Sequence, residues 1–223
     1  MARSHARWVR ISHWIVAASV LTLCVTGFEI LMVHPRLYWG AAGNDLTPAL
    51  IELPISRNYR HGGYTPPTPL ARNSAGPMSA ERTYDIFNKN GWGRSLHFLA
   101  GWFLVVPGIV YLLIGLADGH FRTNIWPTAN EVTRGPQYSL QQKVAYSCVV
   151  FVAAPLMVLT GLTMAPAVTA AFPLLLQVFG GYQSARTIHF AVFVALLLFV
   201  IGHVVMVAKS GFWRQLRAMT IGE

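Results

Sequence analysis

Long apolar runs separated by short charged stretches dominate the sequence. Four runs contain no Asp, Glu, Lys or Arg, and they lie between residues 10 and 29, 94 and 118, 143 and 186, and 186 and 209. These runs are 18, 23, 42 and 22 residues long. Because a helix needs about 20 apolar residues to cross roughly 30 Å of hydrocarbon, the pattern predicts an integral membrane protein with at least four spans.

We place the four transmembrane helices at about 11–33, 95–116, 144–164 and 187–208. The 42-residue run is long enough for two spans, but Pro166, Pro173 and the pair Gly180 and Gly181 interrupt its second half. We therefore expect the segment 167–185 to contribute a short helix lying at the membrane surface. The expected fold is an all-α four-helix bundle that forms one domain over residues 1–223.

A stretch of about sixty residues, 34–94, separates the first two predicted helices. Its Pro, Gly and Asn content and its TPPTP run at 65–69 are typical of an irregular loop outside the membrane. Loops of this length are often functional, and we expect this one to form a docking surface for a partner protein.

The distribution of basic residues predicts the orientation in the membrane. Three short segments are rich in them, namely those with Arg3, Arg7 and Arg10, with Arg122, Arg134 and Lys143, and with Lys209, Arg214 and Arg217. The opposite short loop has only Arg186. By the positive-inside rule both termini and the 117–143 connection are cytoplasmic, and the loop 34–94 is periplasmic.

Composition agrees with this reading and excludes several other functions. The chain is 54% hydrophobic and 11% charged, with a net charge of +9, which the cytoplasmic flanks largely explain. Cys24 and Cys148 both lie in apolar runs, and CxxCH, GxGxxG and GxxxxGK[ST] are all absent. These observations exclude a disulfide framework, covalently attached haem and the usual nucleotide-binding loops. No basic and aromatic pattern indicates nucleic-acid binding.

Histidines are the candidate functional residues. Four of the eight fall inside predicted spans, and these are His13, His97, His189 and His203. A strongly polar residue in a membrane is costly, so each should have a partner or a ligand. For any one of them, an interhelical hydrogen bond to Ser, Thr or backbone is an equally good interpretation.

The arrangement of the four histidines favours a ligand. His189 and His203 are 14 residues apart, which places them within about 40° of one helix face and about 21 Å apart along the axis. Antiparallel helices then bring His13 to the depth of His203 and His97 to the depth of His189. A fifth span within 167–185 would invert the last helix and break both pairs.

Two histidines that face each other at one depth suit a six-coordinate haem iron. Each supplies an imidazole nitrogen, and the apolar bundle accommodates the macrocycle. A bare transition metal is the competing interpretation, but two nitrogens without Cys, Asp or Glu make a poor site for it. Two axial histidines also leave no open position on iron, which favours electron transfer over oxygen chemistry.

Short motifs around these histidines resemble a known family. They are R-x-x-H-W from Arg10, S-L-H-F from Ser95, L-T-G-L from Leu159, and R-x-x-H from Arg186 with a second histidine 14 residues on. Together they are similar to the di-haem cytochrome b subunits of bacterial nickel-iron hydrogenases, formate dehydrogenases and thiosulfate reductases, grouped with bacterial cytochrome b-561 proteins. The longer first loop departs from the hydrogenase-associated members.

The resemblance implies a multi-pass protein of the bacterial cytoplasmic membrane that binds two haem b groups through the pairs His13/His203 and His97/His189. It also implies exchange with quinone near the cytoplasmic haem. A periplasmic redox subunit, either a molybdopterin or an iron-sulfur enzyme, is the implied partner.

Other residues near the histidines have two interpretations each. Arg10, Arg94 and Arg186 lie within three residues of His13, His97 and His189, where they either pair with haem propionates or only anchor the helix ends. Five glycines either open room for the porphyrin faces or serve close helix packing, and these are Gly27, Gly101, Gly108, Gly161 and Gly202. Glu29 is placed to meet Arg94 or a proton path.

The sequence leaves three functional hypotheses. The first is a membrane subunit that carries electrons between the quinone pool and a periplasmic oxidoreductase. The second is a stand-alone cytochrome b that oxidises a small donor such as superoxide, with quinone as acceptor. The third is an anchor or transporter whose histidines only form hydrogen bonds or relay protons.

Overall fold

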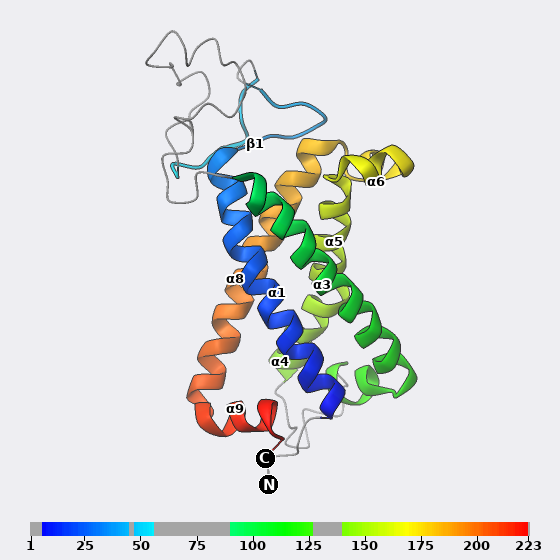
Figure 1. The fold of residues 1–223 in the computed structure, drawn as a ribbon, viewed down its shortest axis with the longest axis vertical. Coiled ribbons are helices and arrows are strands. Elements are labelled where there is room, and N and C mark those ends of the chain that lie inside the picture. The colour runs from blue at the N-terminus through cyan, green and yellow to red at the C-terminus, as the bar shows by residue number, and fades with distance from the viewer. Residues whose placement is uncertain (1–5, 45–46, 56–89, 127–139, 223) are drawn as a thin grey trace. The chain divides into compact units, whose positions relative to one another are not determined.

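A computed structural model of the protein describes residues 6–44, 47–55, 90–126 and 140–222. Most of the predicted loop 34–94 therefore lies outside the described residues. Four helices are long and apolar enough to cross a membrane, and they are drawn in Figure 1 as α1, α3, the α4–α5 helix and α8. This confirms the fold class, an all-α integral membrane protein with four spans.

The spanning helices extend beyond the apolar runs that predicted them. They cover α1 (Arg7–Val33), α3 (Asn90–Ala117), α4 (Leu140–Cys148) continuing through η4 (Val149–Ala153) into α5 (Ala154–Thr163), and α8 (Tyr182–Lys209). A helix of 28 residues, such as α8, is about 42 Å long. That exceeds the hydrocarbon thickness, so its charged and polar ends continue the helix into the headgroup layer.

The third span contains a π-helical segment just before a proline. Pro155 has no N–H to donate to the carbonyl of Phe151, and its ring would clash with that carbonyl in a regular helix. The segment η4 (Val149–Ala153) is π-helical at this point. Such a local widening accommodates the proline without ending the span.

Burial along the helices follows the pattern of a membrane protein. Thr26, Glu29 and Thr160 are at most 1% exposed, whereas Leu113 and Leu198 are 63% and 65% exposed. In water this distribution would be unfavourable, because polar groups would lose hydration while apolar side chains met solvent. In lipid it is expected, since exposed leucines contact acyl chains and polar groups find partners inside.

The chain forms two compact units, and each contains a part of all four long helices. The first unit comprises residues 1–17, 103–159 and 189–223, and the second comprises residues 18–102 and 160–188. We describe the two units separately below.

In the second unit, the segment after α1 is held against the start of α8. Its short strand β1 (Arg36–Leu37) pairs antiparallel with β2 (Ile51–Glu52). The Gly40 carbonyl accepts hydrogen bonds from the N–H groups of Gln183 and Ser184 at 3.0 and 3.2 Å. These belong to the first turn of α8, whose N–H groups have no partner within the helix. A carbonyl from a distant segment therefore caps α8.

This cap requires glycine at position 181. Gly181 has a φ of +111°, and a Cβ added there would lie 2.5 Å from the Gly40 carbonyl oxygen. A side chain would thus strain the backbone and displace the capping carbonyl. Ser184 and Thr187 add side-chain bonds to the same segment, because the Gly40 N–H donates to Ser184 Oγ at 2.7 Å and Thr187 Oγ1 donates to the Tyr38 carbonyl at 2.6 Å.

The segment predicted to hold one surface helix contains two. They are α6 (Pro166–Ala171) and α7 (Leu174–Val178), and the yellow α6 of Figure 1 leaves the direction of α5. Pro173 separates them, because its ring and missing N–H prevent α6 from continuing. The prediction of a single short helix is therefore corrected to a pair of helical turns.

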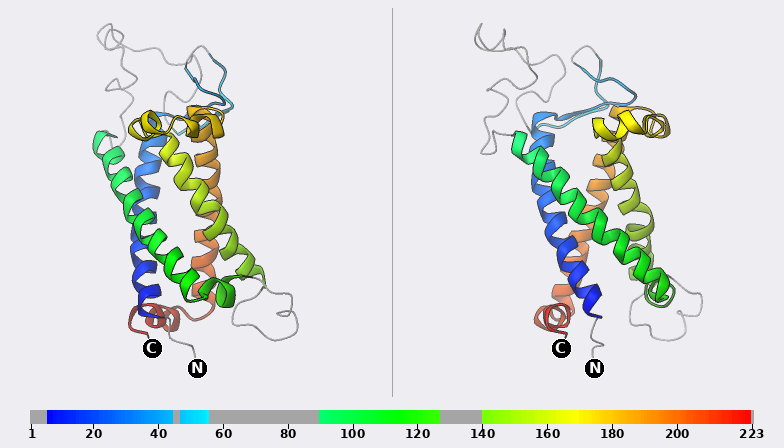
Figure 2. Two further views of the ribbon diagram at one scale, coloured as in Figure 1. Left: turned by 90° about the vertical axis from the view of Figure 1, so that its right-hand side faces the viewer. Right: turned by 45° about the vertical axis from the view of Figure 1, so that its right-hand side comes forward.

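In the first unit, a further helix follows α8. Gly211, with a φ of +101°, ends the turn after α8, and α9 (Phe212–Thr220) then runs in a different direction (Figure 2). No element was predicted beyond residue 208, so α9 is an addition to the expected fold. Figure 2 places it beside the first turns of α1, and two hydrogen bonds described below join them.

Candidate functional site

His13 on α1 and His203 on α8 lie side by side in the first unit. Their imidazole centroids are 6.3 Å apart, and the ring planes make an angle of 52°. Trp14 packs edge-on against His13 at 5.3 Å, and Phe199 stacks on His203 at 6.2 Å with an angle of 17°. Each imidazole is therefore held by an aromatic neighbour on its own helix. The structure brings together the pair that the sequence predicted at this depth.

The spacing of these rings matches the requirement for two axial ligands on one metal ion. A metal–nitrogen bond is about 2.0 Å long and an imidazole centroid lies about 1.2 Å from its nitrogen, so two ligand rings on opposite sides of one ion have centroids about 6.4 Å apart. The observed separation of 6.3 Å is close to this value. Aromatic rings in direct contact also have centroids about 4.5–7 Å apart, so this separation is compatible with a haem iron between His13 and His203 but does not by itself identify one.

The donor set favours haem over a bare ion. In the part of the chain that the structure describes, no three His, Cys, Asp or Glu side chains come together as a metal site would require. Two imidazoles alone are a weak site for a divalent ion, whereas haem brings four nitrogens of its own.

Two side chains beside His13 bind the end of α9. Arg10 Nη1 donates to the Thr220 carbonyl at 3.1 Å, and Trp14 Nε1 donates to the Met219 carbonyl at 3.0 Å. Carbonyls in the last turn of a helix have no partner within it and carry partial negative charge. Arg10 and Trp14 thus cap α9 and join the helix that carries His13 to the segment that follows His203.

His97 on α3 contacts α1 in the second unit. Its Nδ1 lies 2.9 Å from Thr26 Oγ1. A Cβ added at Gly27 would lie 3.3 Å from His97 Cε1, so glycine lets the α1 backbone approach the ring closely. This is the interhelical hydrogen bond considered for each histidine as the alternative to a ligand. The contact involves Nδ1, and an imidazole has a second ring nitrogen, Nε2.

His189 lies on α8 and is half-buried. It belongs to the first unit, whereas His97 belongs to the second. The pairing of His97 with His189 therefore stays a prediction. Within the first unit, His189 and His203 lie on one unbroken helix, which at about 1.5 Å per residue separates them by about 21 Å.

The three arginines near the histidines differ in their contacts. Arg186 donates through Nη1 to the Arg36 carbonyl at 3.1 Å and through Nη2 to the His34 carbonyl. Arg94 is exposed, and its guanidinium lies 5.7 Å from the centre of the Phe98 ring. Arg186 thus anchors the segment after α1, a role that the sequence did not predict. Propionate pairing by Arg10, Arg94 and Arg186 stays a prediction.

Glu29 is buried against the backbone of α3. Its side chain is 1% exposed, and a Cβ added at Gly93 would lie 1.8 Å from Glu29 Oε2. Glycine at 93 thus makes room for the carboxyl group. The sequence analysis placed Glu29 near Arg94, the residue that follows Gly93. It did not identify Gly93 itself as the neighbour of the carboxyl group.

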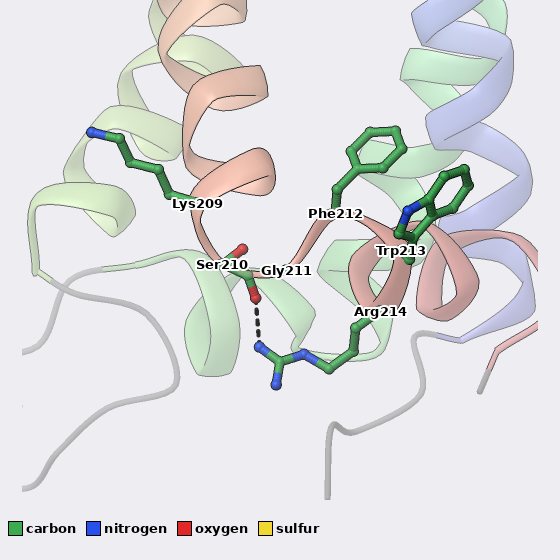
Figure 3. A pocket seen from close by; sticks show the side chains of 6 residues that line it. All are labelled: Lys209, Ser210, Gly211, Phe212, Trp213 and Arg214. Carbon is green, nitrogen blue, oxygen red and sulfur yellow. Dashed lines mark hydrogen bonds between the residues drawn. The ribbon is translucent and has the colours of Figure 1, made fainter.

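A shallow hollow lies at the turn between α8 and α9. Figure 3 shows the six residues that line it, from Lys209 to Arg214, with Arg214 Nη2 donating to the Ser210 carbonyl. None of the predicted site residues lines this hollow. The candidate site is therefore built from the histidine-bearing helices and not from this surface.

Comparisons with known proteins agree with this arrangement. The family model described as "Prokaryotic cytochrome b561" matches residues 4–222. A curated relative from Azospira oryzae, named "Putative protein-methionine-sulfoxide reductase subunit YedZ1", is 26% identical over 221 residues, covering 92% of this chain and 89% of the relative. No solved structure matches the chain.

Proposed function

The chain belongs to the prokaryotic cytochrome b561 family, and we propose that it holds two haem b groups that carry electrons between the quinone pool and a periplasmic redox subunit. The family is one of haem-binding, electron-transferring membrane proteins, and the four spans fit a multi-pass protein of the inner membrane. The number of haems, the quinone and the nature of the partner are our proposal.

The observation that carries the proposal is the separation of His13 and His203. Their 6.3 Å centroid distance supports one bis-histidine haem on these residues. We assign the second haem to His97 and His189, because the helix directions predicted from the sequence place these two at the other depth. Thr26 and Gly27 on α1 give His97 a defined position in that half of the membrane.

Haem, when bound, supplies one-electron redox chemistry, and the protein's residues set the conditions for it. His13 and His203 would hold one group, His97 and His189 the other. Trp14 and Phe199 restrict the rotation of the first pair of rings. The apolar surfaces of the helices would exclude water from the surroundings of both groups.

We infer the orientation of the protein in the membrane from the distribution of its basic residues. We place both termini, and with them His13 and His203, on the cytoplasmic side, and the loop 34–94 on the periplasmic side. A long periplasmic loop suits a partner subunit, and the Azospira relative is itself named a reductase subunit. We infer that a periplasmic oxidoreductase, of the molybdopterin or iron-sulfur class, exchanges electrons with the His97 side.

Haem stoichiometry of purified variants tests the assignment. Wild-type protein should show a reduced b-type spectrum and two haems per chain. His203→Ala and His189→Ala should each lose one haem. His120→Ala is the control, because His120 packs against Trp8 and Tyr111 and has no proposed role with haem. A colourless wild-type protein, or two haems in His203→Ala, would exclude the proposal.

A second measurement separates the partnered function from a stand-alone one. A periplasmic subunit should co-purify with the protein from its native membrane, and removal of that subunit should stop electron delivery but leave both haems in place. Superoxide-dependent reduction of the haems by the isolated protein, with no subunit required, would instead support the stand-alone oxidoreductase.

A further inference from the structure

We propose that Thr26 is a positioning residue that fixes the tautomer of His97 and lowers the reduction potential of the haem bound there. The inference rests on the proposed function, since it takes His97 to be an axial ligand. It assigns a role to a hydroxyl on a different helix, 71 residues from the histidine in sequence.

Burial and hydrogen bonds fix the position of the Thr26 side chain. It is 1% exposed, and its Oγ1 lies 2.7 Å from the Thr22 carbonyl and 2.9 Å from His97 Nδ1. Threonine is stiff at χ1, and the bond to the preceding turn of α1 holds the hydroxyl in one rotamer. The oxygen is therefore at a fixed position when the imidazole meets it.

Counting donors gives the tautomer. A hydroxyl has one hydrogen, and we assign it to the shorter of the two contacts, the one of 2.7 Å with the Thr22 carbonyl. The Thr26 oxygen can then only accept in its contact with His97, so Nδ1 carries the ring proton. In a neutral imidazole this leaves the lone pair on Nε2, which is the nitrogen that would bind iron.

The same contact explains why a hydrogen bond and a haem ligand are compatible here. Were the hydroxyl to donate to Nδ1, the proton would sit on Nε2 and block ligation. With the hydroxyl hydrogen assigned to the Thr22 carbonyl, the lone pair stays on Nε2. A Cβ added at Gly27, the next residue, would lie 3.3 Å from His97 Cε1, so glycine there leaves room for the ring in the position from which it meets Thr26.

A hydrogen bond from Nδ1–H makes the imidazole a stronger electron donor at Nε2. A stronger donor stabilises ferric over ferrous iron, so it lowers the potential. Replacing the hydroxyl with a methyl group removes the acceptor while keeping the shape of the side chain. The expected result is a higher potential for the haem on His97 and no change for the haem on His13 and His203.

The experiment is a spectroscopic redox titration of the purified two-haem protein. Thr26→Val should raise one of the two midpoint potentials, by up to about tenfold in the ferric-to-ferrous ratio, or about 59 mV for a one-electron couple. Thr26→Ser should restore the wild-type value because it keeps the oxygen. Thr22→Val is the matched control, since its hydroxyl bonds back to the Ala18 carbonyl at 2.9 Å; both potentials should remain unchanged.

The outcomes distinguish this inference from the proposed function. Two haems with unchanged potentials in Thr26→Val would overturn the role of Thr26 and leave the ligand assignment intact. Two haems in His97→Ala would instead overturn the ligand assignment itself. If Thr26→Val loses a haem before titration, Thr26→Ala is titrated instead: one raised potential supports the role, and two unchanged potentials contradict it.

Discussion

Trp14 and Met219 are joined by a hydrogen bond from the indole N–H to the main-chain carbonyl, 3.0 Å long and spanning 205 residues of sequence. The same indole packs edge-on against His13. One side chain therefore supports a candidate ligand with its ring and holds α9 with its nitrogen. These two functions can be separated, because phenylalanine keeps a ring and lacks the N–H.

Trp14→Phe should destabilise the first unit by about 1 kcal/mol, the usual cost of one hydrogen bond. For a chain of this size that lowers the melting temperature by about 2–4 °C. The melting temperature is measured from the loss of the reduced haem absorbance when the protein is heated in detergent. Trp213→Phe is the control, since Trp213 is 71% exposed on α9, and an equal loss in that variant would contradict the role of the indole N–H.

Gly27→Ala should disturb the haem on His97 while the fold is retained. The added Cβ would lie 3.3 Å from His97 Cε1, so the ring must move by a few tenths of an ångström to accept it. We expect a shifted low-spin signal in electron paramagnetic resonance for one haem. Gly101→Ala, where a Cβ would have nothing within 4 Å, should leave the spectrum unchanged, and equal shifts in both variants would argue against a specific contact.

Gly101→Leu should expel one haem, although Gly101→Ala should not. Gly101 lies four residues after His97, on the same face of α3, and the space beside it is open. Helix packing therefore does not require glycine there, whereas a porphyrin beside His97 would need the room. Haem per chain is the measurement. Leu99→Phe, which enlarges a side chain 53% exposed on another face of α3, should keep both haems.

Arg186→Lys should loosen the segment after α1 and leave haem content unchanged. Lysine carries the charge but cannot bind two carbonyls as the planar guanidinium does. A loss of about 2 kcal/mol is expected for these charge-assisted bonds, seen as faster proteolysis within 34–55. Arg94→Lys is the control, because Arg94 contacts the Phe98 ring on its own helix. This variant should be cleaved at the wild-type rate. Haem loss in Arg186→Lys would favour the propionate interpretation instead.

Composition and helical period predicted most of the fold. Charge-free runs located the four spans, and depth alone paired His13 with His203. These patterns did not predict α9, because Arg214 and Arg217 make that segment too polar for a search that looks for spans. A nine-residue helix after a glycine has an amphipathic signal, with Phe212 and Leu216 one turn apart, that a search for surface helices would detect.

Contacts between side chains on different helices could not be predicted from the sequence. Helical period gives the face on which Thr26 lies but not the rotation of α1 relative to α3, so the bond to His97 could not be foreseen. From its place at a helix start, Arg186 was expected either to meet a propionate or only to anchor the helix end. Its bonds to His34 and Arg36 depend on the turn that follows α1, which has no periodic signal.

The bonds from Arg10 and Trp14 to α9 also have a consequence for biosynthesis. Synthesis proceeds at about 5–20 residues per second, so about 10–40 s separate the appearance of Trp14 at the ribosome from that of Met219. The first helix therefore precedes its partners on α8 and α9 by most of the time that synthesis takes. The contacts of Arg10 and Trp14 with α9 are therefore among the last to form as the chain is made.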